Sequence, residues 1–466
     1  MSRLAAGPLG VRSFRLLAGG QFTSTIGDYC YAVALPWLVL SNRGGVILLG
    51  TVLACYGVPR TVLIPLGGVL ADKVGPRTVM LAADATRCVL VAALAVLASR
   101  HTASLDTLGP IAALVGAGEG MFIPASYAIM PSLLDEERLA GGNAISTAAV
   151  QAGSLLGPAL GGALVAATRA STWAFAADAA SFAVSALTLA LVPRKAAIDS
   201  VTAGATGTAD AAGAAAIDGD DAGAEPVEAG EAGTAVADAG GVGSAGGVLA
   251  LLKTSRVLQV ILVVVVAANL AGGGMSEVAL PSLAHARFGA AGYGALLACF
   301  AAGGLTGALA ASRTGGLRTP AIFASAAFLV ESVAIGLTPY LGGEVGAAAM
   351  LFLSGATNGL GNVMFLTVMQ KWAPPALLGR VMSVLMLCAF GSFPLSVAIS
   401  GLLVRHIGPS LFFPVAGGLV AVAILAGLTQ REFRQFGARQ RGVAPPGPRG
   451  DSDEGRPDLV MAPEAS

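Results

Sequence analysis

The chain has 466 residues, of which 55% are hydrophobic and only 12% are charged, and its formal net charge is zero. Soluble domains carry about a quarter of charged residues, so this composition excludes an ordinary soluble globular protein. A bilayer core about 30 Å thick is crossed by a helix of roughly 20 apolar residues. Apolar runs of that length fill most of the sequence. The composition therefore indicates a membrane protein with many helices.

Twelve apolar segments predict an all-α membrane protein with twelve transmembrane helices. Six predicted helices precede a long polar stretch and cover residues 14–40, 46–70, 78–99, 107–131, 143–167 and 173–192. Six more follow it and cover residues 256–280, 291–312, 320–339, 345–370, 378–404 and 410–429. Two bundles of six helices are the expected arrangement.

The polar stretch between the two sets predicts the domain boundaries. It holds nine acidic residues between Asp199 and Asp238 and no basic one. It has almost no large apolar side chain to bury, so we expect a disordered cytoplasmic linker, either a plain tether or a regulatory docking segment. The predicted units are a first six-helix bundle, the acidic Ala/Gly-rich linker, a second six-helix bundle and a disordered cytoplasmic tail, over residues 1–193, 194–250, 251–430 and 431–466.

The placement of Lys and Arg predicts the orientation. If the chain begins in the cytoplasm, the loops outside the cell hold few basic residues and the cytoplasmic segments hold most of them. The outside set would be Arg43, Arg100, Arg169, Arg287 and Arg405. We therefore expect a multi-pass protein of the inner (cytoplasmic) cell membrane with both termini in the cytoplasm.

A glycine-rich charged segment joins the second and third predicted helices. It reads Gly68-Val-Leu-Ala-Asp72-Lys73-Val-Gly75-Pro-Arg77. This pattern resembles the cytoplasmic loop signature of the major facilitator superfamily, in which Asp72 and the cations would form a conformational switch. The resemblance implies a secondary transporter made of two pseudo-symmetric bundles, with a substrate site near the midplane. A weaker echo, Gly307-Ala-Leu-Ala-Ala311, stands in the second half.

The fifth predicted helix carries a second motif. Its small residues and proline resemble the Gly/Pro motif of drug exporters in the same superfamily, although Ala144 stands where that family has a further glycine. The motif residues are Gly153, Gly157, Pro158, Gly161 and Gly162. Close helix packing by small residues is the alternative explanation.

Further segments resemble the exporter branch that includes macrolide efflux proteins and enterobactin-type siderophore exporters. They are Gly27-Asp28, Val33-Ala-Leu-Pro36, Phe122-Ile-Pro-Ala125, Ala177-Asp-Ala-Ala-Ser-Phe182 and Gly379-Arg-Val-Met382. One departure is that no arginine stands between Ile111 and Gly118, where many proton-driven exporters carry one. Proton coupling through that arginine is therefore not expected.

Two carboxyl groups near the middle of predicted helices are the candidates for proton coupling. Asp28 lies in the first helix and Glu119 in the fourth. An ionisable group at the bilayer centre is costly and is a functional candidate by default. The superfamily resemblance places both helices beside the central cavity. Desolvation favours the protonated form of a carboxyl group, so either could exchange a proton. Interhelical hydrogen bonding is the alternative role for both.

Other polar residues receive secondary predictions. Asp84 and Arg87 lie one helical turn apart and predict a structural ion pair. Arg60 could pair with one of the buried carboxylates, whereas Asp178, Glu277 and Glu331 are weaker network residues. The candidates for substrate contact, for which interhelical bonds are the alternative, are Tyr29, Tyr31, Gln151, Asn269, Asn358 and Asn362.

The sequence predicts a transporter rather than an enzyme. It contains no HExxH, GxSxG or P-loop motif, and its five cysteines show no metal or redox spacing. We therefore expect no catalytic residues, no cofactor, no metal site and no nucleic-acid partner. The prediction is a monomeric, proton-coupled exporter of small amphiphilic molecules such as drugs, antibiotics or siderophores. An uptake permease of the same fold and a transport-inactive membrane sensor remain open alternatives.

Overall fold

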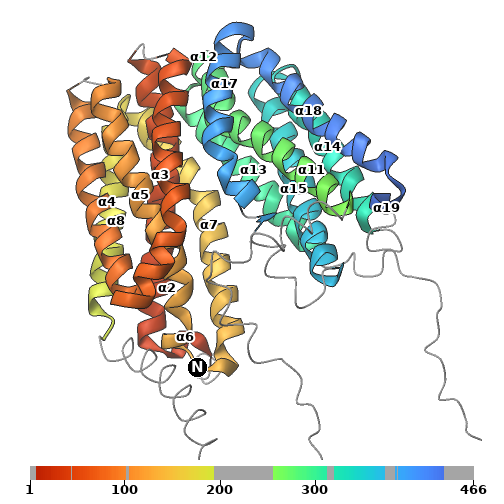
Figure 1. Cartoon of the computed structure of the whole chain (residues 1–466). Helices are drawn as coiled ribbons and strands as arrows, with labels where there is room; N and C mark the ends of the chain where they lie inside the picture. The colour runs from red at the N-terminus through yellow and green to blue at the C-terminus, as the bar shows by residue number, and fades with distance from the viewer. Residues whose placement is uncertain are drawn as a thin grey trace, which may run out of the picture.

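A computed structural model describes residues 7–42, 45–100, 104–193, 256–311, 320–372, 384–385 and 387–434. Its described residues form helices and no strand. Figure 1 shows two groups of helices side by side. The first contains η1 (Pro8–Gly10), α2 (Arg12–Ser41), α3 (Gly45–Val74), α4 (Pro76–Ser99), α5 (Leu105–Ala128), α6 (Met130–Leu133), α7 (Glu136–Thr168) and α8 (Thr172–Leu191).

The second group follows the predicted linker, which lies outside the described residues. It contains α11 (Arg256–Gly274), η4 (Met275–Ala279), α12 (Leu280–Arg287), α13 (Gly289–Ala311), α14 (Pro320–Leu337), α15 (Gly343–Trp372), α17 (Phe393–Ile407), α18 (Pro409–Thr429) and α19 (Arg431–Arg434). The short helix α19 falls where the predicted tail begins, and the rest of that tail lies outside the described residues.

Eleven helices among the described residues are long and apolar enough to cross a membrane. Helix α2 has 30 residues and is not one of the eleven. Its first and middle turns are rich in polar side chains, which include Gln21 and Asp28. With α2 counted, the described helices correspond one by one to the twelve predicted segments.

The seventh span is longer than the sequence predicted. We expected it to end at residue 280, but the helical path continues through the π-helix η4 and α12 to Arg287. Pro281 lies in the first turn of α12, directly after the π-helix η4. We expected Arg287 in an outside loop, beyond the end of this span. Glu277 is therefore ten residues from the end of the span rather than close to it.

Two pairs of glycines bring the bundles into backbone contact. A Cβ atom added to Gly50 of α3 would lie 2.7 Å from the carbonyl oxygen of Val397 and 3.3 Å from Cα of Gly401 in α17. Gly162 of α7 meets Gly294 of α13 in the same way, with 2.9 Å from its added Cβ to Cα of Gly294. No other residue type fits at these crossings without a shift of the backbone.

The glycine pairs also fix the register between the two halves. The second span of each bundle (α3 or α13) crosses the fifth span of the other (α17 or α7) at one of these glycine pairs. Gly50 of α3 therefore corresponds to Gly294 of α13, a difference of 244 residues. Gly162 of α7 corresponds to Gly401 of α17, a difference of 239 residues. The first difference relates α3 to α13 and the second relates α7 to α17. The sequence echo of Gly68 with Gly307 has a difference of 239 in the α3 to α13 pair, so it lies five residues out of the structural register.

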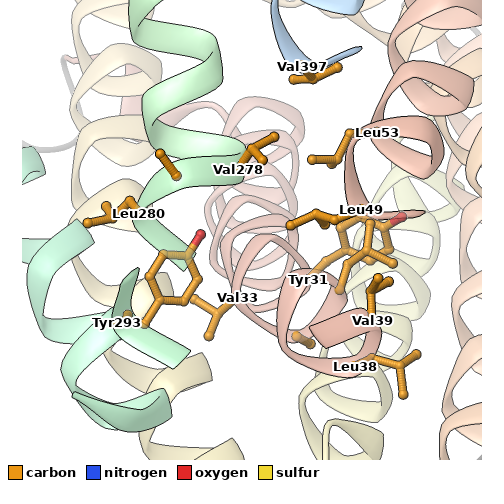
Figure 2. Close-up of a cluster of buried hydrophobic side chains, with 14 of the residues drawn as sticks. Tyr31, Val33, Leu38, Val39, Leu49, Leu53, Val278, Leu280, Tyr293 and Val397 are labelled. Atoms are coloured by element: carbon orange, nitrogen blue, oxygen red, sulfur yellow. The ribbon is translucent and has the colours of Figure 1, made fainter. Parts of the chain in front are cut away.

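One end of the two-bundle unit is closed by apolar packing. A single cluster of buried side chains takes members from both bundles, including Val33 and Leu49 from the first and Val278 and Leu280 from the second. Figure 2 shows these side chains converging between the bundles. At the same end, Ser41 Oγ lies 3.4 Å from Nε2 of His285. Figure 1 shows the bundles diverging toward the end where the chain starts.

Candidate functional site

A cavity of about 700 Å³ lies at mid-depth in the protein. Most of its wall comes from the first bundle, and Glu277 and Phe393 come from the second. The wall reaches Ser126 and Asn143, which lie close to the diverging end of the bundles. The ionisable wall residues include four carboxylates and two guanidinium groups, which are Asp28, Glu119, Asp178, Glu277, Arg60 and Arg87.

Arg87 is the centre of the first charged group in the wall. Its Nη2 lies 2.6 Å from Oδ1 of Asp84, and its Nη1 lies 3.6 Å from Oδ1 of Asp28. The guanidinium is also held between two aromatic rings, 4.7 Å from the centroid of Phe122 and 4.3 Å from that of Phe182. Such cation–π contacts orient a guanidinium in the absence of water.

The exposures of these three side chains differ. Asp84 is fully buried, Arg87 is 2% exposed and Asp28 is 45% exposed. Ser185 donates a further hydrogen bond to Asp84 at 2.6 Å. The predicted pair of Asp84 and Arg87 is therefore present. It also anchors a cation that faces Asp28 in the cavity, a connection that the sequence did not predict.

Glu119 is the centre of the second charged group. Its Oε1 lies 3.1 Å from Nη2 of Arg60, and its Oε2 accepts a hydrogen bond from the hydroxyl of Tyr56. The Arg60 guanidinium also lies 5.7 Å from the ring centroid of Phe390, which belongs to the second bundle. Arg60 therefore pairs with one of the buried carboxylates, and the structure identifies that carboxylate as Glu119.

Two further carboxylates of the wall had only weak signals in the sequence. Asp178 of α8 is 1% exposed and accepts a hydrogen bond from the Ser181 hydroxyl at 3.3 Å. Glu277 lies in the π-helix η4, a type of element that often occurs at functional sites. Both were predicted to be weaker network residues. Their position in the middle of long apolar segments was the available signal.

The predicted substrate contacts divide into two sets. Tyr29 and Tyr31 line the cavity, and the Tyr31 ring packs edge-on against Phe175 at 5.7 Å between centroids. The other four predicted contacts are not among the lining residues of this conformation, and they are Gln151, Asn269, Asn358 and Asn362. The Asn269 amide donates to the carbonyl of Val265 in its own helix.

The predicted switch segment lies at the diverging end of the first bundle. Gly68, Asp72 and Lys73 belong to the last turns of α3. Gly75 has a φ angle of 85°, which glycine adopts freely, and it links α3 to α4. Arg77 donates hydrogen bonds of 2.9 and 2.8 Å to the carbonyl oxygens of Leu189 and Ala190.

Arg77 therefore satisfies carbonyl groups at the end of α8 within its own bundle. Asp72 forms no ion pair with the described residues of this conformation. The expected network between Asp72 and Arg77 is therefore not formed within the part of the chain that the structure describes. Of the two, only Arg77 has side-chain hydrogen bonds to described residues, and they go to the end of α8.

The Gly/Pro motif of the fifth span faces two neighbours. Gly153, Gly157 and Gly161 pack against α2, and an added Cβ on Gly161 would lie 2.9 Å from Cα of Cys30. Gly162 faces α13 of the other bundle, and the carbonyl oxygen of Pro158 also contacts that helix. The motif thus joins a cavity-lining helix to the crossing between the bundles.

Solved structures of other transporters have the same helical architecture as this chain. A transporter of the POT family superposes with a TM-score of 0.64 at 15% identity and covers 90% of this chain and 96% of its own. A D-xylose–proton symporter superposes with a TM-score of 0.62 at 12% identity, covering 91% and 96%. At these identities the likeness establishes the fold alone.

Sequence comparison finds transporters. The uncharacterised MFS-type transporter YfiS of Bacillus subtilis is 25% identical over 431 residues, which cover 90% of this chain and 94% of YfiS. The multidrug efflux pump Tap of Mycolicibacterium fortuitum is 28% identical over 172 residues, which cover 36% of this chain and 41% of Tap. The putative multidrug resistance protein MdtD of Yersinia pseudotuberculosis is 28% identical over 150 residues, covering 32% and 31%.

The family model agrees with these similarities. The model of the Major Facilitator Superfamily matches residues 17–393, from the first helix to the start of α17. The match, the membrane-spanning helices and the central cavity all describe a multi-pass membrane transporter for small molecules. The chain belongs to the Major Facilitator Superfamily.

Proposed function

We propose that the chain is a proton-coupled exporter of small amphiphilic molecules. The observation that carries this proposal is the 700 Å³ cavity, in which carboxylate and guanidinium groups are set among apolar and aromatic side chains. A mostly apolar pocket with a few polar groups suits an amphiphilic ligand. The multidrug relatives Tap and MdtD support the same substrate class at low identity.

The proposed orientation supports export as the direction of transport. The end toward which the bundles diverge carries most of the described basic residues that lie at the ends of helices, including Lys73, Arg77 and Arg138. The positive-inside rule places that end in the cytoplasm, with both termini. The conformation is then open to the cytoplasm and closed to the outside of the cell, so it can take up cargo for export.

Proton coupling is assigned to Asp28 and Glu119. Each carboxylate faces a guanidinium, at 3.6 Å for Asp28 and Arg87 and at 3.1 Å for Glu119 and Arg60. Protonation of a carboxylate removes the attraction to its cation and changes the relative energies of the two conformations. Asp28 is the first candidate because its half-exposed side chain can exchange protons with water in the cavity.

The two bundles, residues 1–193 and 251–430, are proposed to rock about the cavity as a monomer. The 194–250 segment then acts as a cytoplasmic tether. Asp72 and Arg77 would form their switch contact in the alternate conformation, in which the cytoplasmic ends of the bundles approach each other. The Arg77 bonds to the end of α8 hold the guanidinium at this surface.

Inside-out membrane vesicles test the proposal. Export corresponds to uptake into these vesicles, so we expect ethidium to accumulate when the vesicle interior is acidified. An ionophore that collapses the pH gradient should release it. Asp28→Asn should abolish this accumulation while the protein remains in the membrane. Asp106→Asn, at an exposed position in the first turn of α5, is the matched control and should transport normally.

Three outcomes contradict the proposal. Ethidium, antibiotics and siderophores that accumulate only in right-side-out vesicles would indicate uptake. Transport whose rate and extent do not depend on the pH gradient would exclude proton coupling. Unchanged gradient-driven transport by the Asp28→Asn variant would exclude the assigned role of Asp28.

A further inference from the structure

A second buried carboxylate site lies in the second bundle, away from the described cavity. Glu331 of α14 is 8% exposed, and its Oε1 accepts a hydrogen bond of 2.8 Å from the side-chain amide of Asn358 in α15. Asn362, one turn further along α15, donates to the Asn358 side-chain oxygen at 2.9 Å and is exposed. A hydrogen-bonded chain therefore leads from the surface of α15 to Glu331.

The register between the halves shows which surface of α15 this is. Gly116 and Gly120 of α5 contact the backbone of Tyr56 and Arg60 in α3. Gly355 and Gly359 of α15 contact the backbone of Phe300 and Gly304 in α13. The difference between 355 and 116 is 239, and that between 300 and 56 is 244, as at the cross-bundle glycine pairs.

This register relates Asn358 to Glu119 and Asn362 to Ile123, because 119 and 123 plus 239 are 358 and 362. Both Glu119 and Ile123 line the described cavity. The pseudo-twofold arrangement thus places Asn358 and Asn362 on the face of α15 that corresponds to the cavity face of α5. Pro76 is the first residue of α4 and Pro320 is the first described residue of α14, and the difference between them is 244. The same difference relates Glu331 to Arg87.

The surroundings of Glu331 contain no balancing cation among the described residues. Helix α14 packs against α15, α18 and α19. Helix α18 has no ionisable side chain, and the described side chains of α15 include one, Glu344, fourteen residues or about 21 Å along the helix from Asn358. Helix α19 meets the start of α14 near Ala321, ten residues or about 15 Å from Glu331, and carries Arg434 there.

The counterparts of the cations in the first bundle are also missing. Arg60 corresponds to Gly304, and the position of Arg87 is taken by Glu331 itself. A buried carboxylate without a cation is costly, whereas a protonated carboxyl group is not. The Oε2 atom of Glu331 accepts no hydrogen bond from the described residues, so it is free to hold the proton.

We propose that Glu331 is a further proton-binding site, in the second bundle, which exchanges its proton with water that reaches the exposed Asn362. The proton binds to Oε2 and leaves from it, and no other bond changes. Asn358 keeps the carboxyl group oriented in both states, because its amide can donate to either form. The site rests on the proposed transport cycle for its use, but its proton binding can be tested alone.

Infrared difference spectroscopy of the full-length protein in liposomes tests the site directly. A protonated carboxyl group has a C=O stretching band that a carboxylate lacks. We expect a band that appears as the bathing solution is acidified and that is absent in Glu331→Gln, a variant that retains the Asn358 hydrogen bond. Asn358→Ala should shift the same band. Glu344→Gln removes the carboxylate of α15 and should leave the Glu331 band unchanged.

Two spectroscopic outcomes and one chromatographic outcome would overturn the proposal. The first is a set of pH-dependent bands that is identical in Glu331→Gln and the wild type. The second is a Glu331 band that does not change with pH, which would mark a permanently protonated structural group. The third is a Glu331→Gln protein that elutes as an aggregate while Glu344→Gln elutes normally, which would mark a packing role.

A different experimental result would show that the proposed function itself is wrong. In that case wild-type vesicles show no ethidium transport driven by the pH gradient, and this result does not depend on any Glu331 variant. If the wild type does transport ethidium, Glu331→Gln should lose transport driven by the pH gradient and retain exchange of ethidium at equal pH. Loss of both activities together would contradict a specific role in proton exchange.

Discussion

Arg60 of α3 and Glu119 of α5 form an ion pair in the cavity wall, with 3.1 Å between Nη2 and Oε1. Their side chains are 21% and 23% exposed, and Tyr56 donates to the second carboxylate oxygen. The pair connects two neighbouring helices of the first bundle. Its loss should therefore affect both the shape of the cavity and the stability of the bundle.

The pair is expected to behave as a unit in a double-mutant cycle. Arg60→Gln and Glu119→Gln should each lower the thermal midpoint in detergent, because each leaves one charge without its partner. The double variant should recover part of the loss, with a coupling of about 0.5 to 3 kcal/mol. Additive losses in thermal unfolding experiments would show that the two side chains do not interact.

Arg87 should tolerate less change than any exposed arginine. Arg87→Gln leaves the buried Asp84 carboxylate with the single hydrogen bond from Ser185. Breaking a buried pair in this way costs about 3 to 5 kcal/mol. Arg87→Lys keeps the charge but loses the forked geometry and the stacking on both rings, so we expect a folded protein with impaired transport.

A matched control is the pair of Arg138 and Asp135, which has the same spacing and is separated by 3.8 Å at an exposed position. Arg138→Gln should change stability by less than about 1 kcal/mol. Thermal unfolding and ethidium transport provide the two measurements. Equal effects of the substitutions at the two arginines would refute the role assigned to burial.

The glycine crossing between the bundles predicts a conformational effect. In Gly294→Ala, the new methyl group would meet the carbonyl oxygen of Pro158, so the closed end should open more often. A cysteine pair at Ser41 and His285, introduced after the five native cysteines are replaced, reports closure through disulfide formation. We expect cross-linking to be slower in Gly294→Ala.

Gly418→Ala is the control for this experiment, since no atom lies within 4 Å of an added Cβ at that position. Its cross-linking should match that of the parent protein. Faster or unchanged cross-linking in Gly294→Ala would show that the glycine contact does not limit closure.

The proposed orientation predicts which loops face outward. A cysteine at Arg100 should react with an impermeant maleimide on intact cells, whereas a cysteine at Arg138 should react only after the membrane is opened. The positive-inside rule places these two residues on opposite sides. The reverse labelling pattern would place the diverging end of the bundles outside the cell and would contradict export from the cytoplasm.

The fold was largely predictable because helix length and hydrophobicity are local properties. All twelve predicted spans have a helical counterpart among the described residues. The errors concern the ends of helices. Helix α7 begins at Glu136 rather than at residue 143, since helical structure continues outside the apolar segment that defined the prediction. The span that contains Glu277 continues to Arg287 for a similar reason.

The sequence predicted how deep the site residues lie along their helices, but not which neighbouring helix each side chain faces. Asp28 and Glu119 were found in the cavity wall because a charge in the middle of an apolar helix requires a polar environment. Sequence position alone does not show which neighbour a side chain faces. Asp178 was therefore predicted to be only a weaker network residue, and Arg87 was predicted to pair structurally with Asp84, although both belong to the cavity wall.

The distribution of charge between the bundles affects the cost of the transport cycle. The ion pairs of Arg60 with Glu119 and of Arg87 with Asp28 and Asp84 all lie within the first bundle. Rocking of one bundle against the other can carry these opposite charges together as a rigid set. In the proposed cycle the contacts between the bundles that change are then mainly glycine backbone and apolar contacts, apart from the approach of Arg60 to Phe390 and the carboxylate of Glu277 in the cavity wall. The electrostatic barrier to reorientation should therefore depend mainly on Glu277 until a proton or a cargo molecule changes the charge of the set in the first bundle.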